Sequence, residues 1–276
     1  MRRRLIFLDV DGTLTPAGTN TPPASALEAI RAARAAGHGV FLCSGRNRGM
    51  LLPVLGFGFD GAVASAGGYV FAGDELLFDC PMTEEQRSCA VRAFREGGVY
   101  LNVETRDDSF CDEGVAEFLA ASAGGNSELL RWRRQLEKEL GFRPMTEYDG
   151  TPVYKMLFSC ARPEQLAQAR EAMEGAFFFL VHDDPASGCV NGELINRKFD
   201  KGSGVKRIAA AFGVELADTV GFGDSMNDRE MVRTVGTSVC MANGSPALKE
   251  LSDLVCPAVE EDGLAFAFAE LGLTSI

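Results

Sequence analysis

The stretch that decides the fold is LIFLDVDGTLT, residues 5–15. Its first four residues are all apolar, which predicts a strand buried on both faces, as in a parallel sheet covered by helices. Asp9 then lies at the carboxyl end of this strand, where open α/β sheets bind their ligands. The two-residue repeat of a strand points Asp9 and Asp11 the same way, and Gly12 permits a sharp turn. Two carboxylates this close repel each other unless a cation or a shared proton relieves them, so the stretch predicts a metal site.

Three later segments supply matching polar groups. The apolar run 40–43 is followed by Ser44-Gly45-Arg46, and the run 219–222 by Gly-Asp-Ser-Met-Asn-Asp. Between them, Lys201-Gly202 opens a predicted helix whose apolar residues recur at spacings of three and four. An isolated Asp-x-Asp pair is common in surface loops, and a single lysine is usually a solvated charge. The recurrence of such groups at the ends of separate predicted elements favours one shared site.

In this order, the four segments resemble the four motifs of the haloacid dehalogenase superfamily. The motifs are Asp-Val-Asp-Gly-Thr-Leu at 9–14, Ser-Gly-Arg at 44–46, Lys-Gly at 201–202 and Gly-Asp-Ser-Met-Asn-Asp at 223–228. The wide gap before Lys201 and the form of the last motif are similar to the Cof-type branch, class IIB, with its large α/β cap of the C2 type. The resemblance covers the whole chain. It implies an α/β fold with a Rossmann-like, doubly wound parallel-sheet core and an inserted α/β cap domain.

The order of predicted elements places the domain boundaries. Residues 1–82 and 189–276 are expected to form the catalytic core, and residues 83–188 the inserted cap that determines substrate specificity. Helices are expected at 84–97, 113–121 and 127–140, and strands at 99–105, 152–160 and 176–181. This alternation of helices and strands is typical of a separate α/β domain with its own small sheet.

The polar residues suit phosphoryl transfer. A carboxylate nucleophile divides the hydrolysis of a phosphate monoester into formation and hydrolysis of an aspartyl-phosphate. We predict that Asp9 is this nucleophile because it ends the strand. Asp11 is expected to protonate the leaving alcohol and later to accept a proton from water, with a pKa raised by the neighbouring carboxylate. Mg²⁺ suits an all-oxygen site, with Asp9 and Asp224 as ligands, and the resemblance adds the backbone carbonyl of Asp11.

Other residues are expected to stabilise the charge on the transferring phosphoryl group. Lys201 supplies a positive charge and Ser44 a hydroxyl donor, and both are assigned catalytic roles. Asp228 is expected to orient either metal-bound water or Lys201. The residues assigned supporting roles are Asp228, Asn227, Gly45 and Arg46. The candidate substrate contacts are Lys155, Glu193 and Asn196, the last two because they are expected on the strand that returns toward Lys201.

One segment departs from the pattern of the family. Relatives often carry Asn-Gly after the third core strand, where this chain has Ser65-Ala66-Gly67-Gly68. If the asparagine helps to bind phosphate or leaving group, Ala66 removes that contact. The substrate of a relative therefore does not carry over directly to this chain.

Composition limits the functions that fit. The chain has 276 residues, 46% of them hydrophobic and 24% charged, as in an ordinary globular protein of one large or two modest domains. The net charge of −12 argues against nucleic acid as a partner.

The apolar run behind Met1-Arg2-Arg3-Arg4 is too short for a signal peptide or a membrane span. Eight cysteines without close pairing predict reduced thiols in a cytoplasmic protein, and two histidines make a zinc site unexpected. No heptad pattern stands out, so a monomer is the default.

These observations predict a Mg²⁺-dependent phosphatase that acts on a phosphorylated small metabolite, such as a sugar phosphate or a phosphorylated cofactor precursor. A phosphotransferase or phosphomutase of the same superfamily would use the same covalent chemistry but pass the phosphoryl group to another alcohol. A signalling receiver domain that carries a phosphoaspartate is a third alternative. It is disfavoured because a receiver has no use for a large insertion between hydroxyl and lysine, and because Asp11 would shorten the life of the phosphoaspartate.

Overall fold

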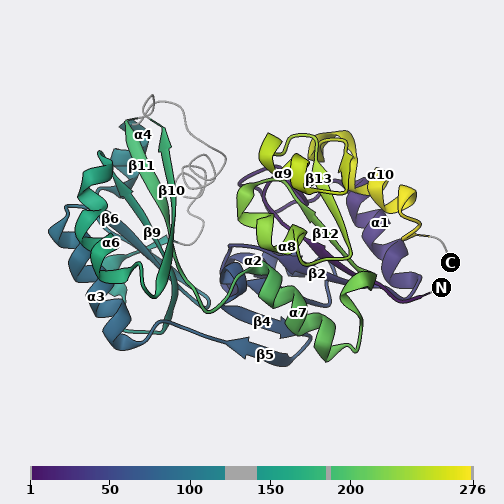
Figure 1. The fold of residues 1–276 in the computed structure, drawn as a ribbon, viewed down its shortest axis with the longest axis horizontal. Helices are drawn as coiled ribbons and strands as arrows, with labels where there is room; N and C mark the ends of the chain where they lie inside the picture. The colour runs from purple at the N-terminus through teal and green to yellow at the C-terminus, as the bar shows by residue number, and fades with distance from the viewer. Residues whose placement is uncertain (1, 122–141, 185–187, 275–276) are drawn as a thin grey trace. The chain divides into compact units, whose positions relative to one another are not determined.

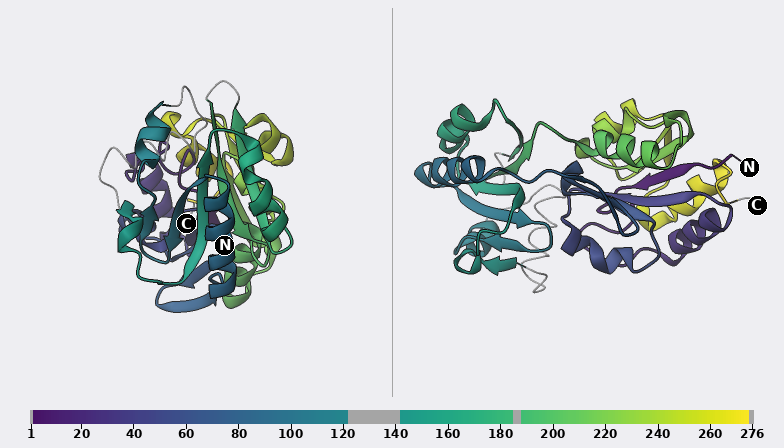
Figure 2. Two further views of the ribbon diagram at one scale, coloured as in Figure 1. Left: turned by 90° about the vertical axis from the view of Figure 1, so that its left-hand side faces the viewer. Right: turned by 90° about the horizontal axis from the view of Figure 1, so that it is seen from below.

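The computed structural model describes residues 2–121, 142–184 and 188–274, which divide into two compact units. The first unit contains Met1–Arg46, Leu51–Asp79 and Phe199–Ile276, and the second contains Asn47–Met50 and Cys80–Lys198. Figures 1 and 2 show the helices and strands of both units in three views. The expected helix at 127–140 lies outside the described residues. Within the described part of the chain, no helix has the length and apolarity needed to cross a membrane.

The first unit is built on an eight-stranded sheet in the order β14-β13-β12-β1-β2-β3-β4-β5. The strands from β14 to β3 run parallel, while β4 and β5 are antiparallel additions at one edge. Strand β1 lies between β12 and β2, so the first strand of the chain is central. The strands are β1 (Leu5–Leu8), β2 (Gly39–Cys43), β3 (Gly61–Ala64), β4 (Tyr69–Ala72), β5 (Glu75–Asp79), β12 (Thr219–Gly223), β13 (Thr237–Met241) and β14 (Leu254–Cys256).

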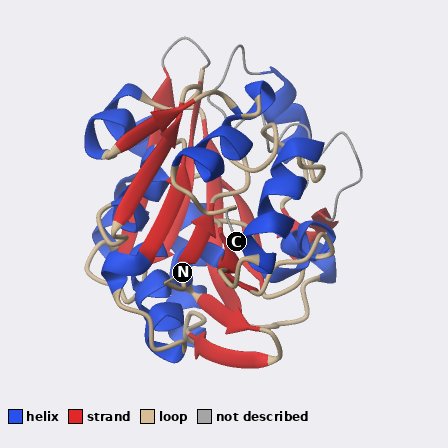
Figure 3. Cartoon of the chain, turned by 90° about the vertical axis from the view of Figure 1, so that its right-hand side faces the viewer, coloured by secondary structure: helices blue, strands red, loops and turns tan. Residues whose placement is uncertain are grey.

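Both faces of this sheet are covered by helices, as Figure 3 shows from one end. Ile6 and Leu8 of β1 pack in the core cluster that includes α1 and α10, whereas Leu5 and Phe7 pack in the cluster that includes α7. The alternation of these four apolar residues between two cores is the reason why the strand is apolar without interruption. The doubly wound fold predicted from the sequence is therefore confirmed. The helices are α1 (Ala24–Ala35), α2 (Arg48–Leu55), α7 (Lys201–Ala211), α8 (Arg229–Val232), α9 (Pro246–Leu251) and α10 (Gly263–Glu270).

The second unit has a six-stranded sheet of its own, in the order β10-β11-β9-β6-β7-β8. All neighbours are antiparallel except β7 and β8. Helices α3 (Glu84–Glu96) and α6 (Ala167–Met173) pack on one face against Met156 and Phe158, and α4 (Val115–Ala121) packs on the other against Leu157. The strands are β6 (Tyr100–Thr105), β7 (Ser109–Cys111), β8 (Phe142–Pro144), β9 (Val153–Cys160), β10 (Phe177–Asp184) and β11 (Cys189–Asn196).

The return to the first unit comes later than the sequence suggests. Strand β11 pairs with β10 on one side and β9 on the other, so residues 189–196 belong to the second sheet. The boundary falls between Lys198 and Phe199 instead of before Cys189. Glu193 and Asn196 therefore lie on an interior strand of the second unit, not on a strand of the first.

Candidate active site

Two aspartates meet at the carboxyl ends of adjacent strands of the first unit. Strands β1 and β12 pair in parallel with Leu8 opposite Phe222, and the Asp9 amide donates to the Phe222 carbonyl at 3.0 Å. Asp9 follows β1 directly and Asp224 follows β12 directly, and both side chains are buried. Parallel strands thus bring together two carboxylates that are far apart in the sequence.

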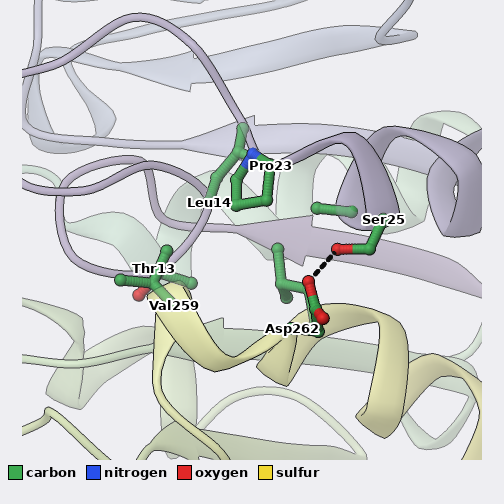
Figure 4. A pocket seen from close by; sticks show the side chains of 8 residues that line it. Thr13, Leu14, Pro23, Ser25, Val259 and Asp262 are labelled. Atoms are coloured by element: carbon green, nitrogen blue, oxygen red, sulfur yellow. Dashed lines mark hydrogen bonds between the residues drawn. The ribbon is translucent and has the colours of Figure 1, made fainter.

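Gly12 makes the close approach of the first motif to Asp224 possible. It has a φ of +85°, and a Cβ at this position would lie 2.6 Å from Oδ2 of Asp224. The next residue, Thr13, donates from Oγ1 to Asp224 Oδ1 at 3.3 Å. Figure 4 shows Thr13 near Val259, Leu14 beside Pro23, and Ser25 donating to Asp262 at the start of α10. Thr13, in the loop after β1, therefore contacts Asp224 on one side and lies near Val259, just before α10, on the other.

Lys201 links the nucleophile candidate to the last motif. It is the first residue of α7, whose N-cap is Asp200, and its side chain is only 2% exposed. Its ammonium donates to Asp9 Oδ1 at 2.7 Å, to Asp228 Oδ1 at 2.5 Å and to Asn227 Oδ1 at 3.2 Å. The other oxygen of Asp228 accepts the backbone amides of Asp224 and Ser225. Asp228 therefore contacts the lysine directly and holds the turn that carries Asp224.

The cluster formed by Lys201 with the nearby aspartates carries more negative than positive charge. Burial, and then the negative charge of Asp228, raise the pKa of Asp9 to about 7, although Lys201 acts in the opposite direction. Burial lowers the pKa of Lys201, but Asp228 and Asp9 outweigh it and hold that pKa well above its ordinary value. The carboxylates of Asp9, Asp224 and Asp228 lie within 4.8 Å of one another. Three buried carboxylates and one ammonium leave the site with a net negative charge. This donor set fits a divalent cation.

The second motif contributes a separate ion pair. Arg46 donates from Nε to Asp11 Oδ2 and from Nη2 to Asp11 Oδ1, both at 2.8 Å. Ser44 follows β2, and its Oγ accepts the amide of Arg46 at 3.2 Å. Asp9 and Asp11 thus contact different cations, Lys201 and Arg46, and the negative charge of Asp11 still contributes to the raised pKa of Asp9. Apart from the place of Arg46 in its motif, nothing in the sequence indicates that this arginine pairs with Asp11.

The segment that replaces the family's Asn-Gly pair is bound between two motifs. Its backbone amides donate to the Arg46 and Ser44 carbonyls, from Ser65 and Ala66 respectively. Ser65 and Ala66 have φ values of +49° and +57°, a left-handed conformation in which side chains other than those of Asn and Asp are uncommon. A Cβ on Gly67 would lie 2.3 Å from the Asp200 carbonyl oxygen. Ala66 thus occupies a backbone position that suits the missing asparagine.

The three candidate substrate contacts belong to the second unit. Lys155 is fully buried and donates to Glu193 Oε1 at 2.8 Å, and its ammonium lies 3.3 Å from Glu104 Oε2. Asn196 is buried too, and its Nδ2 has no hydrogen-bond partner within the described ranges. Glu104 is a member of this cluster that the sequence does not single out, because its β6 position only becomes significant once β6 pairs with β9.

Comparison with known proteins agrees with this arrangement. The family model of the haloacid dehalogenase-like hydrolases matches residues 6–268. A putative phosphatase of Bacillus subtilis, YkrA, is 28% identical over 99% of both chains. A second protein of that organism, the 5-amino-6-(5-phospho-D-ribitylamino)uracil phosphatase YwtE, is 26% identical over 97% of this chain and 98% of its own length.

Solved structures show the same fold. A hypothetical protein from Geobacillus kaustophilus superposes with a TM-score of 0.80 at 24% identity, covering 99% of this chain and 100% of that one. The HAD subclass IIB sugar phosphatase BT4131 gives a TM-score of 0.77 at 21% identity, covering 98% and 99%.

The chain belongs to the haloacid dehalogenase-like hydrolases, since the family model covers nearly all of it. Within them it is of the Cof type, as the wide gap before Lys201 and the form of the last motif predict. The prediction that it is an enzyme, a phosphoric monoester hydrolase, is confirmed by this membership and by the relatives.

Proposed function

We propose that this chain hydrolyses phosphate monoesters of small metabolites through an aspartyl-phosphate on Asp9, with Mg²⁺ as cofactor. The observation that carries the proposal is the buried contact of Lys201 with Asp9 and Asp228, beside Asp224. This contact supports the proposal because Asp9, the ammonium of Lys201 and a second carboxylate lie together at the carboxyl edge of one parallel sheet, where ligands of this fold class bind.

In the first step, an oxygen of the Asp9 carboxylate attacks phosphorus, and the ester P–O bond breaks. The leaving alkoxide takes the proton of the Asp11 carboxyl group, so that a neutral alcohol departs. Lys201 and the Ser44 hydroxyl stabilise the charge on the phosphoryl oxygens during transfer.

In the second step, water attacks phosphorus of the aspartyl-phosphate and gives a proton to the Asp11 carboxylate. The bond between phosphorus and the Asp9 oxygen breaks, which releases inorganic phosphate and restores both aspartates. Asp228 keeps Lys201 in place throughout, because its own two oxygens are held by the ammonium and by two backbone amides.

Asp9 and Asp224 are the residues that would hold Mg²⁺, together with the carbonyl of Asp11. Asp228 fits this role less well, since both of its oxygens already accept bonds from protein donors. When bound, Mg²⁺ neutralises charge on the phosphate and on the attacking carboxylate.

The second unit is proposed to act as the cap that selects the substrate and excludes water from the reaction. Sugar phosphates and phosphorylated cofactor precursors are the proposed substrate classes. The second class is supported by YwtE, a relative of nearly full length whose named substrate is a phosphorylated ribitylamino-uracil.

The test is release of inorganic phosphate from a panel of phosphorylated sugars and cofactor precursors, with Mg²⁺ or with EDTA. Asp9→Asn should lose turnover, and Lys201→Ala should lower kcat by about 10²–10³-fold. Asp74→Asn, on an exposed side chain of the same unit, is the matched control and should retain full activity. Full activity of Asp9→Asn would refute the proposal, and transfer of phosphate to a second alcohol without its release would indicate a phosphotransferase.

A further inference from the structure

We infer that Arg46 is a positioning residue for Asp11, holding the proton-transferring carboxylate in place for the chemical step. The inference rests on the proposed function, because it concerns the group that handles the proton in that reaction. Its basis is the two-point contact of Arg46 with Asp11, in which Nε and Nη2 each donate to a different carboxylate oxygen at 2.8 Å. Such a fork fixes the plane of the carboxylate as well as its position.

Each of the three guanidinium nitrogens of Arg46 donates at least one hydrogen bond. Its Nη1 donates to Asn20 Oδ1 at 2.5 Å, and its Nη2 also donates to the Thr19 carbonyl at 2.9 Å. Its backbone amide donates to Ser44 Oγ, and its carbonyl accepts the amide of Ser65. The side chain is 2% exposed. The guanidinium is thereby a rigid support, because moving it would break several bonds at once.

Asp11 has a second support from the loop that follows it. The Gly18 amide donates to Asp11 Oδ1 at 2.9 Å, so this oxygen is held from two directions. Residues Gly18, Thr19 and Asn20 all contribute to the same small network, through bonds to either Asp11 or Arg46. The network lies entirely in the first unit.

A residue that acts through Asp11 should matter most where the leaving group needs a proton. An alkoxide from a hexose 6-phosphate is a poor leaving group, whereas p-nitrophenolate departs without protonation. Arg46→Ala should therefore lower kcat/KM for glucose 6-phosphate by about 10²-fold, the lower end of what proton transfer contributes. The loss for p-nitrophenyl phosphate should be less than about tenfold, with KM nearly unchanged for both compounds.

Lysine at this position provides a second variant that keeps the charge. Arg46→Lys preserves the charge but cannot bind both oxygens of one carboxylate in the same way, so its loss should be intermediate and should depend on the leaving group in the same way. In an Asp11→Asn background, Arg46→Ala should cause no further loss on glucose 6-phosphate, because the group it positions is already gone.

Arg34→Ala is the matched control. Arg34 makes a similar two-point contact with Asp60 in the first unit, but on the surface. This variant should leave both reactions unchanged, and thermal melts monitored by circular dichroism should show whether each variant is folded.

Equal losses of the Arg46 variants on both compounds, or a full additional loss in the Asp11→Asn background, would overturn the inference and assign Arg46 to substrate binding or to the fold alone. If the wild-type protein with Mg²⁺ releases phosphate from neither compound nor from the wider panel, the proposed function fails instead.

Discussion

Replacing Asp9 by asparagine should make the metal-free protein more stable while it abolishes catalysis. Burial, and then the charge of Asp228, raise the pKa of Asp9 from its ordinary value of 3.8 to about 7. Below pH 3.8 the carboxyl group is protonated in both the folded and the unfolded chain, so its ionisation has no effect on stability. Between pH 3.8 and about 7 only the unfolded chain has lost the proton, and stability falls as the pH rises.

The size of the effect follows from that difference in pKa. A difference of about 3 in pKa corresponds to about 4 kcal/mol of destabilisation of the folded state, and the full amount is reached above pH 7. This free energy already includes the attraction between Asp9 and Lys201, because the ammonium lowers the pKa of Asp9 and so reduces the shift. Asparagine has nearly the same shape and no charge, so Asp9→Asn should recover most of this free energy at pH 8. For a domain of this size the gain corresponds to a rise in Tm of roughly 10 °C.

The assay is thermal unfolding of wild type and Asp9→Asn in EDTA at pH 4 and at pH 8. The two proteins should differ little at pH 4 and clearly at pH 8, and Mg²⁺ should stabilise the wild type more than the variant. Asp74→Asn, at an exposed aspartate in the turn between β4 and β5, controls for the loss of an aspartate as such. An Asp9→Asn variant that is no more stable than wild type at pH 8 would refute the reasoning about the charge deficit of this site.

Three further changes test other parts of the structure. Asp224→Asn should weaken Mg²⁺ binding by at least about tenfold in titration calorimetry, and unchanged affinity would exclude Asp224 as a ligand. Lys155→Met should lower the free energy of unfolding in urea by about 3–5 kcal/mol, because Glu104 and Glu193 would lose the ammonium between them. A change below about 1 kcal/mol would mean that this ion cluster is not structurally important. Ala66→Gly should raise the unfolding free energy by about 1 kcal/mol, as glycine adopts the φ of +57° without strain, and a loss of stability in urea would contradict this.

The sequence predicts the first unit well because its signals are local. The apolar runs at β1, β2 and β12 are each followed by polar residues, so a strand and the group at its carboxyl end are encoded within about ten positions. Parallel pairing then brings those ends together without further information. Asp9, Asp224 and Lys201 therefore meet as expected, and Asp228 contacts Lys201, one of its two expected partners.

Pairing partners outside the motifs are not encoded locally. Strand β11 has the same alternation whichever sheet it joins, so only its contacts with β9 and β10 assign residues 189–196 to the second unit. The choice of Arg46 as partner for Asp11 is likewise made in three dimensions, among 27 lysines and arginines. Glu193 and Lys155 are found by their residue types, but their contact with each other depends on strand register.

The position of β1 in the middle of its sheet has a consequence for how the chain folds. Leu5 pairs with Thr219, so the central strand of the first unit cannot complete its hydrogen bonds until almost the whole chain is available. The second unit needs only Asn47–Met50 and Cys80–Lys198, and all six strands of its sheet have been synthesised by residue 196. Long-range parallel pairing is slow because loop closure must precede it, so we expect the second unit to fold first during synthesis. We therefore expect the edge of the sheet that brings Asp9 beside Asp224, and with it the proposed active site, to form last.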